Sequence, residues 1–95
     1  MTSNFHVQDR PARQRYELTD GGELIAWADY SIDGDTVVVP HVETVVAHRG
    51  QGNAARLMDG VVEDLRATGR GIRPICSFAA GYLRERPETH DLVDR

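Results

Sequence analysis

One short segment combines glycines with a position just before a helix, which is typical of an anion-binding loop. It reads Arg49, Gly50, Gln51, Gly52, Asn53 and Ala54. Glycines let the backbone approach a ligand closely. The first N–H groups of a helix have no internal partner, and the helix dipole adds positive potential there. A phosphate is therefore a natural guest of this segment, the glycine loop, although a plain glycine-containing turn fits the same six residues.

Two familiar phosphate-binding motifs are excluded by the surroundings of the glycine loop. A Walker loop needs a lysine, and all 11 basic residues of the chain are arginines. A dinucleotide-binding fingerprint places its glycines after the first strand of a parallel unit, whereas antiparallel hairpins precede this loop.

The pattern of apolar and turn residues predicts the elements that position the loop. Strands are expected over residues 13–19, 23–32, 36–44 and 72–76, and helices over residues 52–68 and from a capping Ser77 to Pro87. Turns at 20–22 and 33–35 make the first three strands antiparallel. The helix between the last two strands implies a right-handed crossover, which makes those two strands parallel.

Three local features add detail to this outline. Residues 23–32 carry apolar side chains on both faces, which predicts a central strand covered on both sides. Pro40 cannot donate a ladder hydrogen bond, so it indicates an edge or a bulge in its strand. Residues 1–12 hold only a short apolar pair, Phe5 and Val7, and are expected to form a loosely held edge or arm.

Composition limits the class of protein. A chain of 95 residues is expected to form one domain over residues 1–95. Its net charge of −4 argues against non-specific binding of nucleic acid, and its apolar runs are too short to cross a bilayer. One cysteine, Cys76, and no visible secretory signal favour a reducing, cytoplasmic setting.

In this setting the glycine loop resembles the signature of the GNAT superfamily of N-acetyltransferases. That signature is Gln or Arg, two residues, Gly, one residue, then Gly or Ala, and Arg49, Gly52 and Ala54 match it. The resemblance extends over about residues 13–92 to a very small, YjdJ-type branch. It is carried by Gly22-Glu23-Leu24, Tyr30, Asp33-Gly34-Asp35, His41-Val42-Glu43, the glycine loop, Pro74-Ile75-Cys76-Ser77-Phe78 and Tyr82. Members commonly have prolines where this chain has Val45 and Val46, a difference that removes no hydrogen-bond donor.

The resemblance implies an α/β fold with a mixed, mostly antiparallel sheet and two helices. The first two helices of larger members are expected to be missing, because the tight turn at residues 20–22 leaves no room for them. Acetyl-CoA is the implied cofactor, and no metal is expected. Its contacts are assigned to strand residues Val42, Glu43 and Thr44, to the loop residues Arg49, Gly50, Gln51, Gly52, Asn53, Ala54 and Ala55, and to Phe78.

The same resemblance places four candidate catalytic groups near the thioester. Glu43 could remove a proton from an amine, and His41, two residues away on the same strand face, could do so instead. Cys76 at a helix start could carry the acetyl group, and Tyr82 could protonate the departing thiolate. Each also has a structural reading: a solvated charge, a hydrogen-bonded histidine, a buried thiol and a packed aromatic ring.

The expected function is acetyl transfer from acetyl-CoA to an amine, on a protein or peptide because the acceptor site lacks a helical wall. A CoA-binding module without transferase activity is the alternative, and a generic phosphate-binding or protein-interaction domain is a third possibility. The chain is expected to be a monomer or a weak dimer, with no nucleic-acid or membrane partner.

Overall fold

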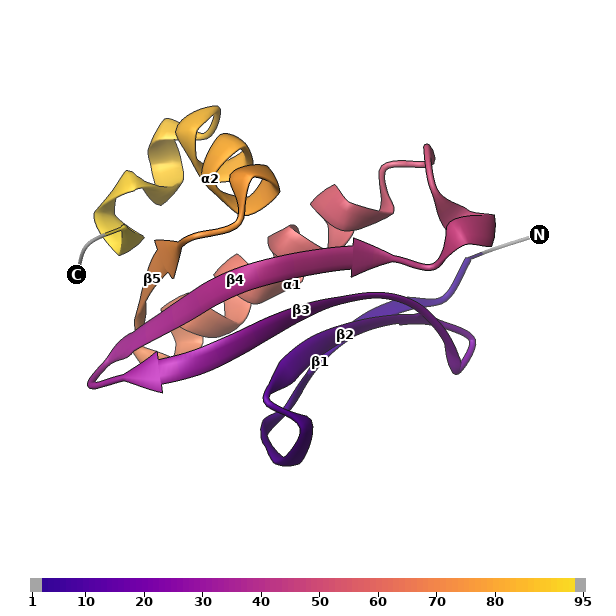
Figure 1. Cartoon of the computed structure of the whole chain (residues 1–95), viewed down its shortest axis with the longest axis horizontal. Coiled ribbons are helices and arrows are strands. Elements are labelled where there is room, and N and C mark those ends of the chain that lie inside the picture. Colours follow the sequence, from indigo (N-terminus) through magenta and orange to yellow (C-terminus); the bar gives the residue numbers. More distant parts are fainter. Residues whose placement is uncertain (1–2, 94–95) are drawn as a thin grey trace.

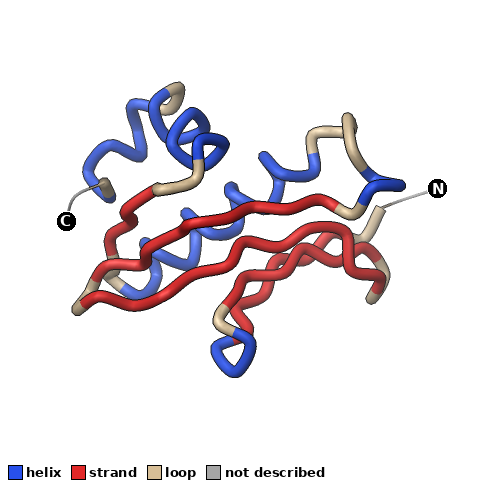
Figure 2. The backbone as a smooth tube through the Cα atoms, in the orientation of Figure 1, coloured by secondary structure: helices blue, strands red, loops and turns tan. Residues whose placement is uncertain are grey.

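The computed structural model describes residues 3–93, in which helices cover one face of a five-stranded sheet (Figure 1). The strands are β1 (Phe5–Arg10), β2 (Arg15–Asp20), β3 (Glu23–Asp33), β4 (Thr36–Thr44) and β5 (Gly71–Pro74). The helices are α1 (Asn53–Thr68) and α2 (Ser77–Arg84), with 3-10 helices at Pro11–Arg13, Val46–His48 and Pro87–Leu92. Figure 2 shows how these alternate along the chain.

The strands lie in the order β1-β2-β3-β4-β5, with β1 to β4 antiparallel and β5 parallel to β4. This confirms the predicted mixed, mostly antiparallel sheet with two α-helices. The apolar stripe of α1 buries Leu57, Met58, Val61 and Leu65 against the sheet. α2 joins the same core through Ala79, Tyr82 and Leu83.

Of the edge or arm expected for residues 1–12, the structure shows an edge, and this edge is firmly paired rather than loosely held; Met1 and Thr2 lie outside the described residues. Residues 5–10 form an edge strand that pairs with β2 along its whole length, from Phe5 opposite Asp20 to Arg10 opposite Arg15. Close packing holds this strand on α1. A Cβ at Gly60 would lie 2.4 Å from the Val7 side chain, so only glycine allows the approach.

Because β1 is an additional first strand, a different connection takes the place of the two helices that larger members have after their first strand. The first strand is β1, so the short link after it is the 3-10 turn Pro11–Arg13. The turn at residues 20–22, to which the sequence argument assigned this role, joins the second and third strands instead. The physical conclusion is unchanged, because neither link has room for two helices.

The prediction that β3 is covered on both faces is wrong. A register shift near Leu18 lets both Ile25 and Ala26 enter the core. Trp27 is only half-buried, and the side chain of Ile32 is 47% exposed. Within residues 3–93, α1 and α2 share one core, which leaves the other side of β1 to β4, the outer face, without a helix.

Of the edge or bulge that Pro40 indicated, the structure shows a bulge. Asp29 pairs with His41 and Ser31 pairs with Val38, so Tyr30 faces two residues of β4, Val39 and Pro40. An extra residue reverses the direction of every side chain beyond it.

This reversal decides where the candidate base lies. Val37 and Val39 point into the core before the bulge, and positions 41 and 43 would have continued that face. Because of the bulge, Val42 packs against the core instead, and His41 and Glu43 turn to the outer face.

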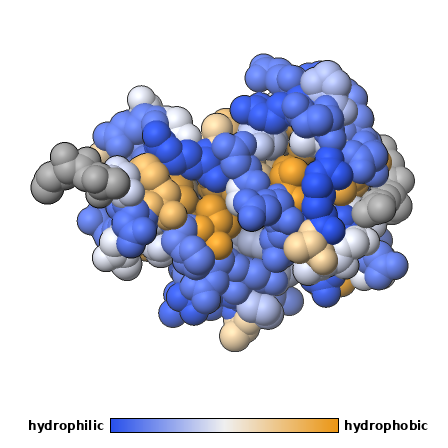
Figure 3. Space-filling view, turned by 180° about the vertical axis from the view of Figure 1, so that it is seen from behind, coloured by the Kyte–Doolittle hydropathy of each residue, from blue (hydrophilic) through white to orange (hydrophobic). Residues whose placement is uncertain are grey.

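The last strand and helix begin and end differently from the prediction. β5 ends at Pro74, so Ile75 and Cys76 lie outside it. Cys76, not Ser77, is the N-cap of α2, and no side chain caps that helix. Pro87 follows the end of α2 and begins a 3-10 helix. Seen from behind (Figure 3), apolar residues show only in separate areas among polar ones.

Candidate functional site

The glycine loop leads into α1 with two residues in left-handed backbone conformations. Gly50 has φ 75° and Gly52, the N-cap, has φ 77°, values that side chains disfavour. The first α1 amide with a helical partner is that of Arg56, which donates to the Gly52 carbonyl at 3.1 Å. The preceding amides of residues 53–55 therefore have no acceptor within the helix.

Those amides lie at a shallow pocket of about 250 Å³, which we call the loop pocket. It is lined by Thr44, His48, Arg49, Gly50, Gly52, Asn53, Ala54, Ala55 and Phe78. A Cβ built on Gly50 or Gly52 meets no atom within 4 Å, so the loop backbone faces open space. The predicted loop residues, except the exposed Gln51, thus line one pocket together with Phe78, whose side chain is 41% exposed.

Asn53 shapes the loop from within. The residue is only 3% exposed, and its Nδ2 donates to the His48 carbonyl at 3.0 Å. Arg56 Nη1 donates to Asn53 Oδ1 at 2.7 Å and to the Gln51 carbonyl at 3.1 Å. Only the backbone of Asn53 is therefore free for a ligand, and its side chain fixes the loop.

Arg56 was missed by the sequence argument. Besides these two bonds, its guanidinium stacks on the Phe5 ring with 4.4 Å to the centroid, so β1 helps to hold the loop. The sequence signal was available, because position 56 lies three residues after Asn53 and shares its side of the helix. Phe5, however, is 51 positions away, and no local pattern links the two residues.

The pairing between β4 and β5 ends where proline interrupts β4. The parallel pairing runs from Thr36–Gly71 to Val39–Pro74. The Val39 carbonyl then accepts from both Ile75 and Cys76, each at 3.0 Å, and the next residue of β4, Pro40, has no N–H. Among the described residues, β4 continues to Thr44 without a strand partner on this side, as expected for a slot that admits an extended ligand.

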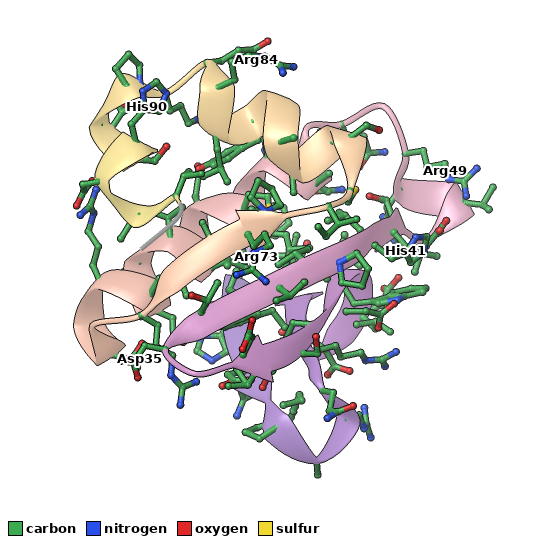
Figure 4. The ribbon with its side chains drawn as sticks, turned by 60° about the vertical axis from the view of Figure 1, so that its left-hand side comes forward. Asp35, His41, Arg49, Arg73, Arg84 and His90 are labelled. Atoms are coloured by element: carbon green, nitrogen blue, oxygen red, sulfur yellow. The ribbon has the colours of Figure 1, made fainter. Side chains whose placement is uncertain are left out.

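Glu43 lies between two basic side chains. Its Oε1 accepts from Arg49 Nη2 at 2.8 Å, and its Oε2 lies 3.0 Å from His41 Nε2. Arg49 Nε also donates to the Thr44 carbonyl at 3.2 Å. Figure 4 shows His41 and Arg49 at the same end of β4. The structure therefore brings the predicted His41 and Glu43 together, and it adds Arg49 to them.

The position of Cys76 fits both roles predicted for it, a structural thiol and a carrier of the acetyl group. It is half-buried and packs against the core, as a structural thiol would. It is also the N-cap of an eight-residue helix at the point where β4 and β5 separate. Its position therefore suits the acetyl-carrier role without requiring it.

Tyr82 points toward α1. Its hydroxyl donates to an Asp59 carboxylate oxygen, and the Arg86 guanidinium lies 3.7 Å from its ring centroid. Burial raises the pKa of the Tyr82 phenol above its ordinary value, and the hydrogen bond to Asp59 raises this pKa further. A phenol whose proton is held in this way is a poorer acid, so this environment favours the packing role.

A second hollow extends the first one along α2. It measures about 300 Å³ and shares Ala55 and Phe78 with the loop pocket, reaching Tyr82 and Arg86 at its far end. Within residues 3–93, no group of three metal-binding side chains is present. No helix in this part of the chain is long and apolar enough to span a bilayer.

Comparisons with known proteins agree with this geometry. The family model for GCN5-related N-acetyl-transferases matches residues 15–92. No curated protein is significantly similar in sequence. The narrower YjdJ-type assignment stays a prediction.

Two solved structures have the same fold. One is the solution structure of a GCN5-like protein from Staphylococcus aureus, described provisionally as an N-acetyltransferase; the TM-score is 0.71 at 23% identity, over 97% of this chain and 90% of that one. The crystal structure of the ribosomal-protein-S18-alanine N-acetyltransferase from Escherichia coli gives 0.63 at 15% identity, over 77% of this chain and 50% of that one. At these identities the likeness concerns the fold.

Proposed function

Because this chain belongs to the GCN5-related N-acetyltransferase family, we propose that it transfers the acetyl group of acetyl-CoA to an amine of a protein or peptide. One observation carries the proposal. The pocket at the start of α1 lies at one end of the β4 segment from Pro40 to Thr44, and the β4–β5 pairing stops at its other end. Glu43 lies within this segment and is bound by Arg49 of the pocket. An extended thioester ligand with a pyrophosphate needs both features.

The residues of the site fit acetyl-CoA. The free amides of residues 53–55 and the open backbone of Gly50 and Gly52 would hold the pyrophosphate. The backbone of residues 42–44, which has no strand partner on the β5 side, would bind the pantetheine arm, and Phe78 would flank it. Bound there, acetyl-CoA supplies an activated acetyl thioester.

Glu43 and His41 are proposed to take the proton that the amine loses as it attacks the thioester carbonyl. Each oxygen of Glu43 already contacts a basic side chain, and each keeps a further lone pair that can accept a proton. His41 is the more exposed of the two and can receive the proton first, with Glu43 stabilising the resulting imidazolium.

Transfer through Cys76 is the competing route. Its thiolate would attack the thioester carbonyl, the bond from that carbonyl to the CoA sulfur would break, and the acetyl group would then pass to the amine. We prefer direct transfer, because a neutral amine attacks a thioester without a carrier. We also propose a cytoplasmic monomer or weak dimer that folds as one domain.

The alternative function is CoA binding without transfer. The pairing of Glu43 with Arg49 favours this alternative, because the guanidinium opposes proton transfer to one of the two proposed bases. Amine-dependent release of the CoA thiol separates the two. Release only in the presence of amine supports the transferase, whereas tight CoA binding without release supports the binding module.

Calorimetric titration with CoA, ADP and inorganic phosphate separates both functions from a generic phosphate site. The CoA-dependent functions require a clear preference for CoA over the two smaller anions. Equal affinities would instead indicate a generic phosphate site and would contradict the proposal.

A further inference from the structure

The outer face of the sheet carries two rows of side chains that run from β1 to β4. The first row is Gln8, Glu17, Trp27 and Glu43, each paired with the next across adjacent strands. The second row is Arg10, Arg15, Asp29 and His41. Neighbouring strands lie about 4.8 Å apart, so β2 is about 10 Å from β4.

Three arginines gather at the β1–β2 end of these rows around one carboxylate. Glu17 receives hydrogen bonds from Arg10 at 3.3 Å, from Arg13 at 3.0 Å and from Arg15 at 2.7 Å. The Glu17 side chain is only 5% exposed, whereas that of Arg13 is 63% exposed. We call this group the arginine cluster.

The arginine cluster has more donors than its one carboxylate can accept. Each guanidinium carries five N–H groups, and the arginines of the cluster outnumber its carboxylate, so a net positive charge of about two remains. The chain as a whole has a net charge of −4, which makes this positive patch locally distinct. Arg10 and Arg13 are exposed, so their free donors can reach a ligand.

The other end of the rows has the opposite character. Glu43 supplies a carboxylate there, next to His41, and Asp29 lies on the neighbouring strand β3, between His41 and Arg15. Between the two ends lies Trp27, half-buried, with the Arg15 guanidinium 5.2 Å from its ring centroid. From β1 to β4 the surface thus offers a site for carboxylates, an apolar floor and a site for an amine.

We propose that the outer face binds an acidic peptide segment, so that the protein acetylates amines with acidic residues nearby. The acceptor amine lies at Glu43 and His41, and the carboxylates of the peptide bind the arginine cluster. An extended chain covers about 3.3 Å per residue, so a span of about 10 Å places the acidic residues about three positions from the amine. This inference deepens the proposed function and rests on it.

Matched peptides with a free N-terminal amine test the proposal. Each carries Asp, Asn or Lys at positions 3 to 5 and is otherwise identical. Two quantities are measured: kcat/KM from release of the CoA thiol, and peptide affinity from fluorescence anisotropy without acetyl-CoA. We expect the Asp peptide to exceed the Asn peptide about tenfold in both, which is the effect of one charge-assisted hydrogen bond.

Charge substitutions link the preference to the arginine cluster. Arg13→Glu should remove the preference for Asp and favour the Lys peptide, while calorimetry still detects CoA binding. Arg13→Gln, which keeps Arg10 and Arg15 on Glu17, should reduce the preference and guards against misfolding. Arg84→Glu is the matched control, because Arg84 is exposed on α2, away from His41 in Figure 4.

The outcomes separate this inference from the proposed function. Equal acetylation of all three peptides overturns the acidic preference and leaves the transferase intact. Selective binding of the Asp peptide without release of the CoA thiol would support the acidic-peptide site on the outer face and contradict the proposed acetyl transfer. A dimer detected by sedimentation that Arg13→Glu dissociates, with no peptide preference, would assign the outer face to a second copy and overturn the inference.

Discussion

Arg49, which lines the loop pocket, donates a hydrogen bond of 2.8 Å to Glu43 near the end of β4. The arginine of the family signature therefore has a partner within the protein. A bound pyrophosphate would compete with Glu43 for this guanidinium, and Arg49 would then release the carboxylate. Binding of the cofactor and activation of the base would be coupled through this one side chain.

The first prediction follows from that pair. Arg49→Ala should weaken CoA binding by about 1 to 3 kcal/mol, the range for a charge-assisted hydrogen bond, as measured by calorimetry. Arg73→Ala, which removes an exposed arginine paired with Asp33, is the control. Unchanged CoA affinity in Arg49→Ala would mean that this arginine binds Glu43 and does not contact the cofactor.

Substitutions in the glycine loop should abolish CoA binding in a folded protein. Ala54→Glu places a carboxylate in the loop pocket, yet a negative charge in the first turn of a helix is compatible with folding. Gly52→Val should have the same effect but adds strain, because its φ is 77°. Ala67→Glu, exposed near the end of α1, controls for net charge. Micromolar CoA binding by a folded Ala54→Glu variant would contradict the site.

Intact mass after incubation with acetyl-CoA alone distinguishes the two transfer routes. Direct transfer predicts no acetyl adduct and near-normal turnover in Cys76→Ser. A stoichiometric adduct that this substitution removes, together with loss of turnover, would establish the cysteine route instead.

Tyr82→Phe should affect stability more than catalysis. It removes the hydrogen bond to Asp59, and because Asp59 is exposed we expect a loss of about 1 kcal/mol in urea unfolding. The value of kcat should stay within about threefold of the original, since the hydroxyl points toward α1. A fall of 100-fold or more, in the range for a general acid, would restore Tyr82 to the catalytic groups.

Glu17 should make stability depend on pH in the acid range. Burial alone would raise its pKa, but hydrogen bonds from Arg15 and Arg13 outweigh burial and hold the pKa of Glu17 below its usual value. A lowered folded-state pKa means that the stabilisation is complete above the unfolded pKa of about 4.3 and is lost as pH falls through the folded value. Glu17→Gln should therefore lower the urea midpoint at pH 7 and have progressively less effect below pH of about 4. If Glu17→Gln lowered the urea midpoint equally at pH 7 and in acid, the charge of the carboxylate would not be what stabilises the fold.

The sequence alone determined the features that depend on neighbouring residues. The turns at residues 20–22 and 33–35, the apolar stripe of α1, the glycine loop and the bulge at Pro40 were predicted, because backbone geometry and helical period act over a few positions. The parallel arrangement of β4 and β5 also followed, since a right-handed crossover permits little else.

Only the tertiary structure decided which distant residues share a surface. The bulge was predictable, but its consequence was not, because the direction of Glu43 depends on the register of β4 against β3. The contact of Arg56 with Phe5 and the bond from Tyr82 to Asp59 likewise join residues at least 23 positions apart. Such contacts are fixed by strand register and by the packing of α1 on the sheet, which no local pattern encodes.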